Sequence, residues 1–198
     1  ALAMAMDKPD LVQGLVLLGG YYYPSPRADA VLMSGPAIPV VGDVMRFTVS
    51  PLLSRILWPG LVKKMFSPRP VASGFRRWPT WLSLRPSQLR AASAETVLMV
   101  PGAASLRHRY PEITMPVTIF SGDGDKMVTP EHNAKGLPRE LLQSQLHTVQ
   151  DAGHMLHHVA QDEIVRAVRD IAQGRPRMDF QQTTHHLDAD NGQPRVLH

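Results

Sequence analysis

The chain contains no cysteine among its 198 residues. This absence excludes disulfide bonds, thiolate nucleophiles and zinc sites built on cysteine. Long hydrophobic runs are also missing: the longest, around Leu15–Leu18, is far too short to cross a bilayer. The apolar segment Ala1–Met6 has no basic flank before it and no cleavage site after it, so we expect no signal peptide. The absence of cysteine is neutral on compartment, and without a signal peptide or a transmembrane segment we expect a cytoplasmic protein.

Acidic residues are missing from a long internal stretch. No Asp or Glu lies between Asp43 and Glu95, although this stretch is rich in basic residues. These are Arg46, Arg55, Lys63, Lys64, Arg69, Arg76, Arg77, Arg85 and Arg90. The simplest interpretation is a solvated basic face. The alternatives are attraction to an anionic substrate or to a membrane surface. Nucleic acid is not an expected partner, because no recognition motif or interleaving of aromatic and basic residues is present.

The composition is that of a globular chain, with 43% hydrophobic and 19% charged residues. Its length suits one domain, or one domain with an inserted subdomain. Near the start, Ala1–Met6 predicts a helix, and the apolar run Leu11–Leu18 predicts a buried strand that ends at Gly19-Gly20. Helix, short loop and buried strand form half of a βαβ repeat.

The middle of the chain, residues 24–111, lacks strand signals and contains many of the 18 prolines, so it predicts a subdomain of short helices. We expect helical segments over Val44–Trp58 with a break at Pro51, over Leu61–Phe66, and over Ser87–Val100. In the last of these, Ser87 is the expected N-cap and Pro101 the expected stop. Most aromatic side chains here, Phe47, Trp58, Phe66, Trp78 and Trp81, are expected to pack between helices rather than to form a lid.

The α/β pattern resumes near residue 112. Strands are predicted over Met115–Phe120 and, nearer the sheet edge, over Ser144–Val149, with a helix around Glu131–Leu137 between them. Gln161–Ala172 predicts an amphipathic helix. Residues 175–198 are polar and patternless, which predicts a disordered tail; its His185-His186 pair is not expected to hold a metal.

Two polar side chains follow the two C-terminal strands. Asp125 comes after the first strand and His154 after the second, so both are expected at the edge where parallel strands end and ligands bind. An aspartate that orients a histidine is the acid–base pair of a catalytic triad. Asp123, in the same loop, is interpreted as a turn residue. His157 and His158 are interpreted as packing at a helix start rather than metal ligands.

Three further residues are candidates for substrate contact: Tyr21, Tyr22 and Met155. The two tyrosines follow the end of the first strand, and Met155 follows His154.

These loops resemble those of the α/β-hydrolases. Gly122-Asp123-Gly124-Asp125-Lys126-Met127-Val128 resembles the family's acid loop, Gly-x-x-Asp-x-x-Val, and Asp151-Ala152-Gly153-His154 resembles its Gly-His loop. The first twenty residues resemble the helix and strand that follow the nucleophile elbow. The resemblance implies an α/β fold: the C-terminal part of the parallel sheet, about three strands with flanking helices, and a helical cap insertion. It implies four parts: core residues 1–23, cap residues 24–111, core residues 112–174 and a tail, 175–198. No cofactor or metal is implied.

The family nucleophile is missing from the sequence. No Gly-x-Ser-x-Gly occurs, nor a Gly-x-Asp or Gly-x-Cys variant, and Ser34, Ser105 and Ser121 lack the strand–turn–helix context with flanking glycines. We therefore expect the nucleophile a few residues before Ala1. We also expect the chain to be inactive and poorly folded alone, because the first strand would present an unpaired apolar edge. A complementing N-terminal half or self-association would cover that edge.

The leading function is hydrolysis of an ester or related acyl bond by a serine nucleophile. The alternatives are an epoxide hydrolase or dehalogenase with an aspartate nucleophile, and a non-catalytic binding module of the same fold. The expected partner is a small apolar molecule, and the basic middle segment leaves room for an anionic one.

Overall fold

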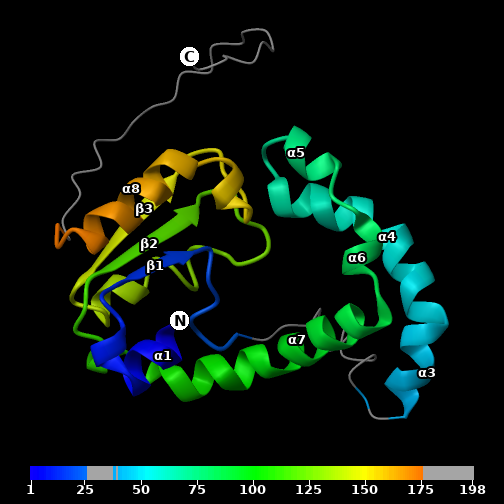
Figure 1. Cartoon of the computed structure of the whole chain (residues 1–198), viewed down its shortest axis with the longest axis horizontal. Helices are drawn as coiled ribbons and strands as arrows, with labels where there is room; N and C mark the ends of the chain where they lie inside the picture. The colour runs from blue at the N-terminus through cyan, green and yellow to red at the C-terminus, as the bar shows by residue number, and fades with distance from the viewer. Residues whose placement is uncertain (26–37, 39, 176–198) are drawn as a thin grey trace, which may run out of the picture.

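The computed structural model describes residues 1–25, 38 and 40–175, and the core is a small parallel sheet (Figure 1). Its three strands are β1 (Leu15–Leu18), β2 (Val117–Gly122) and β3 (Ser144–Val149), in that order across the sheet. The register pairs Leu15 with Val117 and Val117 with Ser144. The predicted α/β fold class with about three strands is therefore confirmed. The predicted tail lies outside the described residues except for Arg175, and so does the His185-His186 pair.

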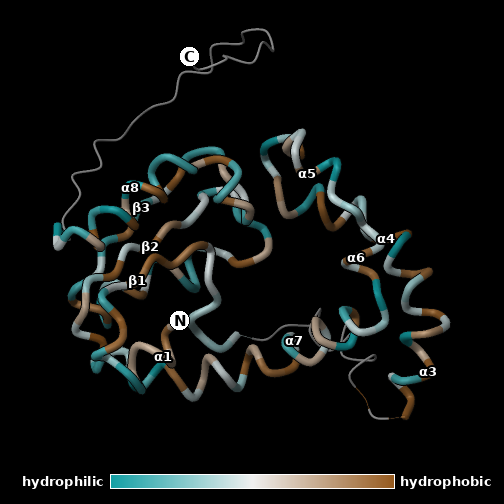
Figure 2. The backbone as a smooth tube through the Cα atoms, viewed as in Figure 1, coloured by the Kyte–Doolittle hydropathy of each residue, from teal (hydrophilic) through white to brown (hydrophobic). Residues whose placement is uncertain are grey.

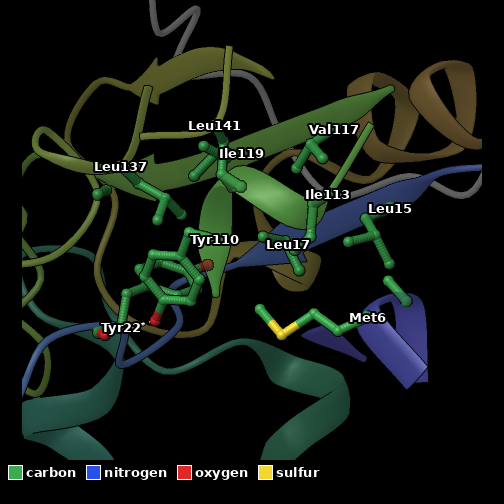
Figure 3. Close-up of a cluster of buried hydrophobic side chains, with 12 residues drawn as sticks. Met6, Leu15, Leu17, Tyr22, Tyr110, Ile113, Val117, Ile119, Leu137 and Leu141 are labelled. Atoms are coloured by element: carbon green, nitrogen blue, oxygen red, sulfur yellow. Dashed lines mark hydrogen bonds between the residues drawn. The ribbon is translucent and has the colours of Figure 1, made fainter. Parts of the chain in front are cut away.

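Both faces of the sheet are packed. Side chains alternate along β1, so Leu15 and Leu17 enter one cluster while Val16 and Leu18 pack against the other. The first cluster joins the sheet to α1 (Leu2–Asp7), the 3-10 turn η3 (Tyr110–Glu112) and the β2–β3 connection, as Figure 3 shows. The second joins it to η5 (Leu156–His158) and α8 (Gln161–Ala172). Another 3-10 turn, η1 (Pro9–Leu11), connects α1 to the loop before β1.

Between β1 and β2 the described chain is helical. The helices are α3 (Val41–Phe47), α4 (Val49–Phe66), α5 (Ser73–Arg76), α6 (Thr80–Ser83) and α7 (Pro86–Arg107). In Figure 1, α3 and the start of α4 lie at the end of the molecule farthest from the sheet, and α7 runs back to it.

The expected end of α7 at Pro101 is wrong. The helix begins at Pro86, a favourable first position for proline, and continues through Pro101 to Arg107. An internal proline removes one backbone hydrogen bond and costs about 3 kcal/mol. Packing offsets this cost, because Ala103 is buried and Leu106 packs against the first core cluster beyond the proline. Ser87 is not the N-cap; Arg85 occupies that position.

The helix expected over Glu131–Leu137 is also absent. This segment consists of turns that lead into a 3-10 turn, η4 (Leu137–Arg139). Asn133, which is 3% exposed, accepts a hydrogen bond from the Tyr22 amide (2.9 Å) and donates to the Thr129 carbonyl (3.3 Å). Such side-chain bonds to the backbone compete with helix formation.

Several aromatic side chains of the helical segment are more exposed than expected. Phe66 is buried and packs against Phe75 at 5.1 Å between ring centroids. Phe47, Trp78 and Trp81 are 67%, 50% and 56% exposed, so the expected packing between helices is wrong for these three.

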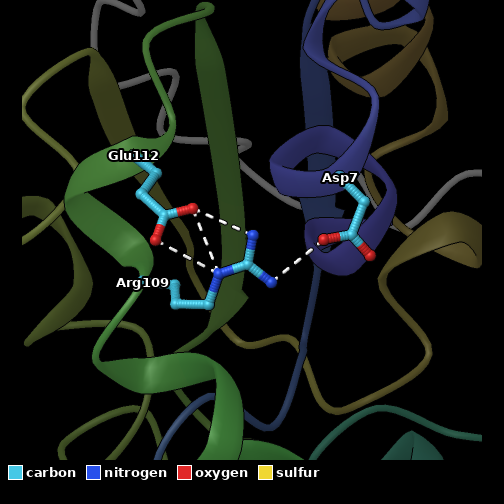
Figure 4. Close-up of polar contacts among 3 residues, drawn as sticks. All are labelled: Asp7, Arg109 and Glu112. Atoms are coloured by element: carbon cyan, nitrogen blue, oxygen red, sulfur yellow. Dashed lines mark hydrogen bonds and ion pairs between the residues drawn. The ribbon is translucent and has the colours of Figure 1, made fainter.

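An ion-pair network on the surface ties α1 to η3. Arg109 donates to Asp7 at 3.0 Å and to both carboxylate oxygens of Glu112 at 2.9–3.1 Å (Figure 4). Because all three side chains are largely exposed, water and salt screen the network. It fixes local geometry more than it stabilises the fold.

Replacing Tyr110 by Phe is expected to lower the free energy of unfolding by about 1–2 kcal/mol. The Tyr110 hydroxyl donates to the Tyr22 carbonyl at 2.5 Å, and the ring is 1% exposed. Burial also raises the pKa of this phenol to about 12. The substitution keeps the ring and leaves a buried carbonyl without its donor. Urea unfolding measures the effect, and an unchanged midpoint and slope would contradict it.

His147 is expected to make the stability depend on pH. Burial beside Phe120 lowers the pKa of its imidazole below the ordinary 6.5, and Glu163 opposes this shift. As the pH falls through 6.5, the unfolded chain takes up the proton before the folded chain does, so stability decreases. His147→Gln should remove this contribution. The difference in unfolding free energy between pH 8 and pH 5 should then be smaller in the variant than in the original chain.

Candidate active site

Asp125 and His154 are brought together by the loops that leave β2 and β3. The Nδ1 atom of His154 lies 2.9 Å from Oδ2 of Asp125. The Asp125 side chain has no exposed surface, whereas 29% of the His154 side chain is exposed. Because a carboxylate only accepts, Nδ1 carries the hydrogen in this contact. The other ring nitrogen, Nε2, is therefore left with a lone pair that can accept a proton.

Backbone donors hold the Asp125 carboxylate in place. Its Oδ1 accepts hydrogen bonds from the amides of Met127 (2.8 Å) and Val128 (3.0 Å), while Oδ2 faces His154. A carboxylate that accepts bonds on both oxygens keeps one orientation. The donors come from the second and third residues after Asp125 and are main-chain atoms, so any residue except proline could supply them.

Asp123 has a different role, in keeping with its interpretation as a turn residue. Its Oδ1 accepts from the Ala152 amide at 3.3 Å, and its own amide donates to the Val149 carbonyl at 3.2 Å. The neighbouring Gly124 donates to the Ala152 carbonyl at 3.0 Å. These bonds fasten the acid loop to the histidine loop.

The end of β1 closes another side of the pair. Gly19 has a φ of +50°, and its amide donates to the Phe120 carbonyl at 2.9 Å. A Cβ at this position would lie 3.3 Å from Nδ1 of His154 and 3.5 Å from Oδ2 of Asp125. Gly19 therefore meets both a backbone conformation and a close approach that suit glycine.

The helical segment touches the histidine loop directly. At the C-terminal end of α4, the Met65 carbonyl accepts from the amides of His154 (2.9 Å) and Met155 (3.3 Å). Arg69 follows α4, and its Nε donates to the Asp151 carbonyl at 2.8 Å. The position of His154 thus depends on the segment between β1 and β2 as well as on the sheet. No pattern in the sequence signals the Met65 contact, because it involves only backbone atoms.

The three predicted substrate-contact residues have different surroundings. Tyr21 is half-buried, and its hydroxyl bonds to the Ser25 carbonyl at 3.1 Å. Met155 is half-buried beside His154. Tyr22 is 3% exposed within the first core cluster, where burial raises the pKa of its phenol (Figure 3). This burial argues against a contact between Tyr22 and a substrate.

His157 and His158 both lie in η5, within a cluster of aromatic rings. The centroid of the His158 ring lies 5.2 Å from that of Phe66, in a tilted contact, and 5.8 Å from that of Phe75, in an edge contact. The His157 and His158 centroids are 4.5 Å apart. Burial lowers the pKa of His157, and the neighbouring His158 and His154 lower it further. Among residues 1–25, 38 and 40–175, no three metal-binding side chains form a group that could hold an ion.

Within the described residues, no hydrogen bond joins the His154 ring to a serine or threonine hydroxyl. In the same part of the chain, no helix is both long and apolar enough to cross a membrane.

Comparison with solved structures gives the class of fold. The enol-lactonase from Burkholderia xenovorans LB400 has 18% identity and a TM-score of 0.61, over 87% of this chain and 60% of that one. A thermophilic esterase from Thermogutta terrifontis has 19% identity and a TM-score of 0.55, over 89% and 61%. A putative ancestral haloalkane dehalogenase has 18% identity and a TM-score of 0.54, over 87% and 63%. The chain therefore has the α/β-hydrolase fold, of which it forms the C-terminal portion.

The chain spans about 60% of the length of these solved chains. These proteins are a lactonase, an esterase and a dehalogenase, so the likeness establishes the fold and leaves the reaction open. No family model matches the chain, and no curated protein does.

Proposed function

We propose that the chain is the acid and histidine part of a hydrolase that cleaves ester or related acyl bonds. The observation that supports this most is the 2.9 Å contact between a fully buried Asp125 carboxylate and the partly exposed His154 ring. A buried, oriented acid with an accessible imidazole is the arrangement that activates a hydroxyl nucleophile. The serine itself would come from a polypeptide segment outside these residues.

The proposed mechanism divides the work between the two side chains. Nε2 of His154 takes the proton of the serine hydroxyl as the oxygen attacks the acyl carbonyl. It then gives that proton to the leaving alcohol, and water repeats the sequence to release the acid. Asp125 keeps the Nδ1 hydrogen pointing toward itself and stabilises the imidazolium while the ring is charged. No cofactor enters these steps.

Residues 24–111 are proposed as the cap of this site, over a small apolar substrate. The contact of the Met65 carbonyl with the His154 amide places the end of α4 at the site. Tyr21, which follows the end of β1, and Met155, which follows His154, are half-buried and are the proposed substrate contacts.

A serine-directed fluorophosphonate probe tests the proposal. The polypeptide extended upstream of Ala1 by its natural sequence should be labelled on a serine that precedes Ala1 within Gly-x-Ser-x-Gly. Labelling should require a folded protein and should fall sharply in His154→Ala. An extended protein that resists the probe, and whose upstream sequence lacks that motif, would contradict a serine hydrolase.

A dehalogenase with an aspartate nucleophile is the second candidate, favoured by the likeness to the haloalkane dehalogenase. The same extended protein would then release halide from short haloalkanes and would leave p-nitrophenyl esters intact. The residue at the elbow, serine or aspartate, separates the two reactions.

A further inference from the structure

Helix α4 is apolar on two opposite faces, although only one of them packs against the protein. Its buried residues are Ser50, Val62 and Phe66. Viewed down the helix axis, successive residues are about 100° apart, and the exposed apolar side chains of α4 fall within an arc of roughly 140°. The three buried residues lie outside this arc. A helix that is hydrophobic all round is normally covered all round. The second face of α4 therefore needs an explanation.

Exposed apolar side chains lie on α3 as well as on α4, and we call the two sets together the outer patch. Each of its side chains is at least 48% exposed. Its members are Val41, Val44 and Phe47 on α3, and Val49, Leu52, Leu53, Ile56 and Leu57 on α4. Figure 2 shows hydrophobic segments along both helices, and Figure 1 places α3 and the start of α4 at the end of the molecule away from the sheet. Apolar patches of this kind mark interaction surfaces.

Uncompensated positive charge borders the outer patch. Lys63 and Lys64 extend the apolar arc of α4 toward its C-terminus, whereas Arg55 falls about 60° outside the arc, between the directions of Val62 and Phe66. All three side chains are exposed, and none forms an ion pair with a residue in the described part of the chain. No acidic residue lies between Asp43 and Glu95 to neutralise them.

We propose that the outer patch docks on an anionic lipid surface. A helix that lies in the plane of a membrane places apolar side chains into the headgroup boundary and keeps lysines and arginines at the level of the phosphates. The apolar arc of α4 with its bordering basic residues has this arrangement. The charge favours a lipid surface over a second copy of the chain. A second copy would bring the same basic side chains to the interface, and the acidic residue of α3, Asp43, already pairs with Arg46 at 2.8 Å.

The position of the basic residues also argues against a role in binding an anionic substrate. Lys63 and Lys64 lie within the outer arc of α4, away from Val62 and Phe66, which face the protein. Contact with the histidine loop comes from the Met65 carbonyl, not from these side chains.

Vesicle sedimentation of the 198-residue chain tests the proposal. The chain should sediment with vesicles of 7:3 phosphatidylcholine and phosphatidylglycerol and much less with pure phosphatidylcholine, and 0.5 M salt should weaken binding. All three tryptophans of the chain lie in the basic stretch, at positions 58, 78 and 81, so a blue shift of their emission provides a second readout.

Three variants separate the contributions of charge and apolar surface. Lys63→Gln with Lys64→Gln should weaken binding to the anionic vesicles about 25-fold, at about fivefold per lysine. Leu52→Glu with Ile56→Glu should abolish binding to both vesicle types. Leu142→Glu is the matched control, since Leu142 is 85% exposed next to β3, and it should bind as the original chain does.

Several outcomes would overturn the proposal. These are no sedimentation of the original chain with anionic vesicles, equal binding to neutral and anionic vesicles, and unchanged binding by the Leu52 and Ile56 double variant. Light scattering that shows a dimer, converted to a monomer by that double variant without any vesicle binding, would assign the outer patch to a second copy instead. Circular dichroism of each variant ensures that the folded forms are compared.

Discussion

Replacing His154 by Ala in the polypeptide extended upstream of Ala1 is expected to lower kcat/KM for p-nitrophenyl esters by about 10⁴-fold or more. The imidazole is the proposed base and acid of both half-reactions, and no other ring is hydrogen-bonded to Asp125 among the described residues. His132→Ala is the control, because His132 is exposed and lies outside the pair. An extended enzyme that keeps its activity without His154 would disprove the proposed mechanism.

The two aspartates of the acid loop should differ in how strongly their substitution by asparagine lowers activity. Asp125→Asn should lower kcat strongly, because an amide in place of the carboxylate no longer holds Nδ1–H in the required tautomer. Asp123→Asn retains an oxygen that can accept from the Ala152 amide, so its activity should stay within about threefold of the original. Equal losses of activity in the two variants would mean that the loop supports activity only through its folded structure and not through the Asp125 carboxylate.

The 198-residue chain alone is expected to show no ester turnover above background, with or without His154. Turnover by this chain that disappears in His154→Ala would place the nucleophile within these residues.

Gly153→Ala is expected to lower the free energy of unfolding by about 3 kcal/mol or more. A Cβ on Gly153 would lie 2.3 Å from the Ser67 carbonyl oxygen and 2.8 Å from that of Met65. Both obstacles are backbone atoms at the end of α4, so relief requires the helical segment to move away from the histidine loop. The same movement would break the bond between the Met65 carbonyl and the His154 amide.

Gly102→Ala is the matched control for this substitution. Gly102 lies inside α7, and nothing lies within 4 Å of the Cβ that alanine would add. There the change should raise stability by about 0.5–1 kcal/mol, because alanine favours the helix. Urea unfolding of the two variants should therefore show midpoints displaced in opposite directions. If Gly153→Ala is as stable as the original protein, the end of α4 can move away from the histidine loop without cost in stability.

The sequence is sufficient to predict the sheet and the closeness of Asp125 and His154, because both depend on local patterns. Apolar runs define the strands, and a loop with fixed spacing places Asp125 beside the amides of Met127 and Val128. The placement of Asp125 and His154 on adjacent parallel strands then follows from the topology.

Errors arose where long-range packing overrides local preference. Pro101 ends a helix by propensity, yet burial of Ala103 beyond it keeps α7 intact. Asn133 bonds with Tyr22, more than a hundred residues away in the chain, and a segment with helical composition forms turns instead. The exposure of Phe47 was equally beyond prediction, since composition does not show which apolar helix face finds a partner.

Among the described residues, β1 pairs with a strand on one side only, so its backbone amides should exchange hydrogen for deuterium at two different rates. The backbone amides of Leu15 and Gly19 donate to carbonyls on the β2 side of β1. Because successive amides of a strand point to alternate sides, the amides of Val16 and Leu18 point to the other side, the outer edge of the sheet. Among the described residues, β1 has no strand on that edge. Backbone deuteration along these few residues should thus fall into two kinetic classes, slow on the inner side and fast on the outer, although Val16 and Leu18 pack their side chains against the core.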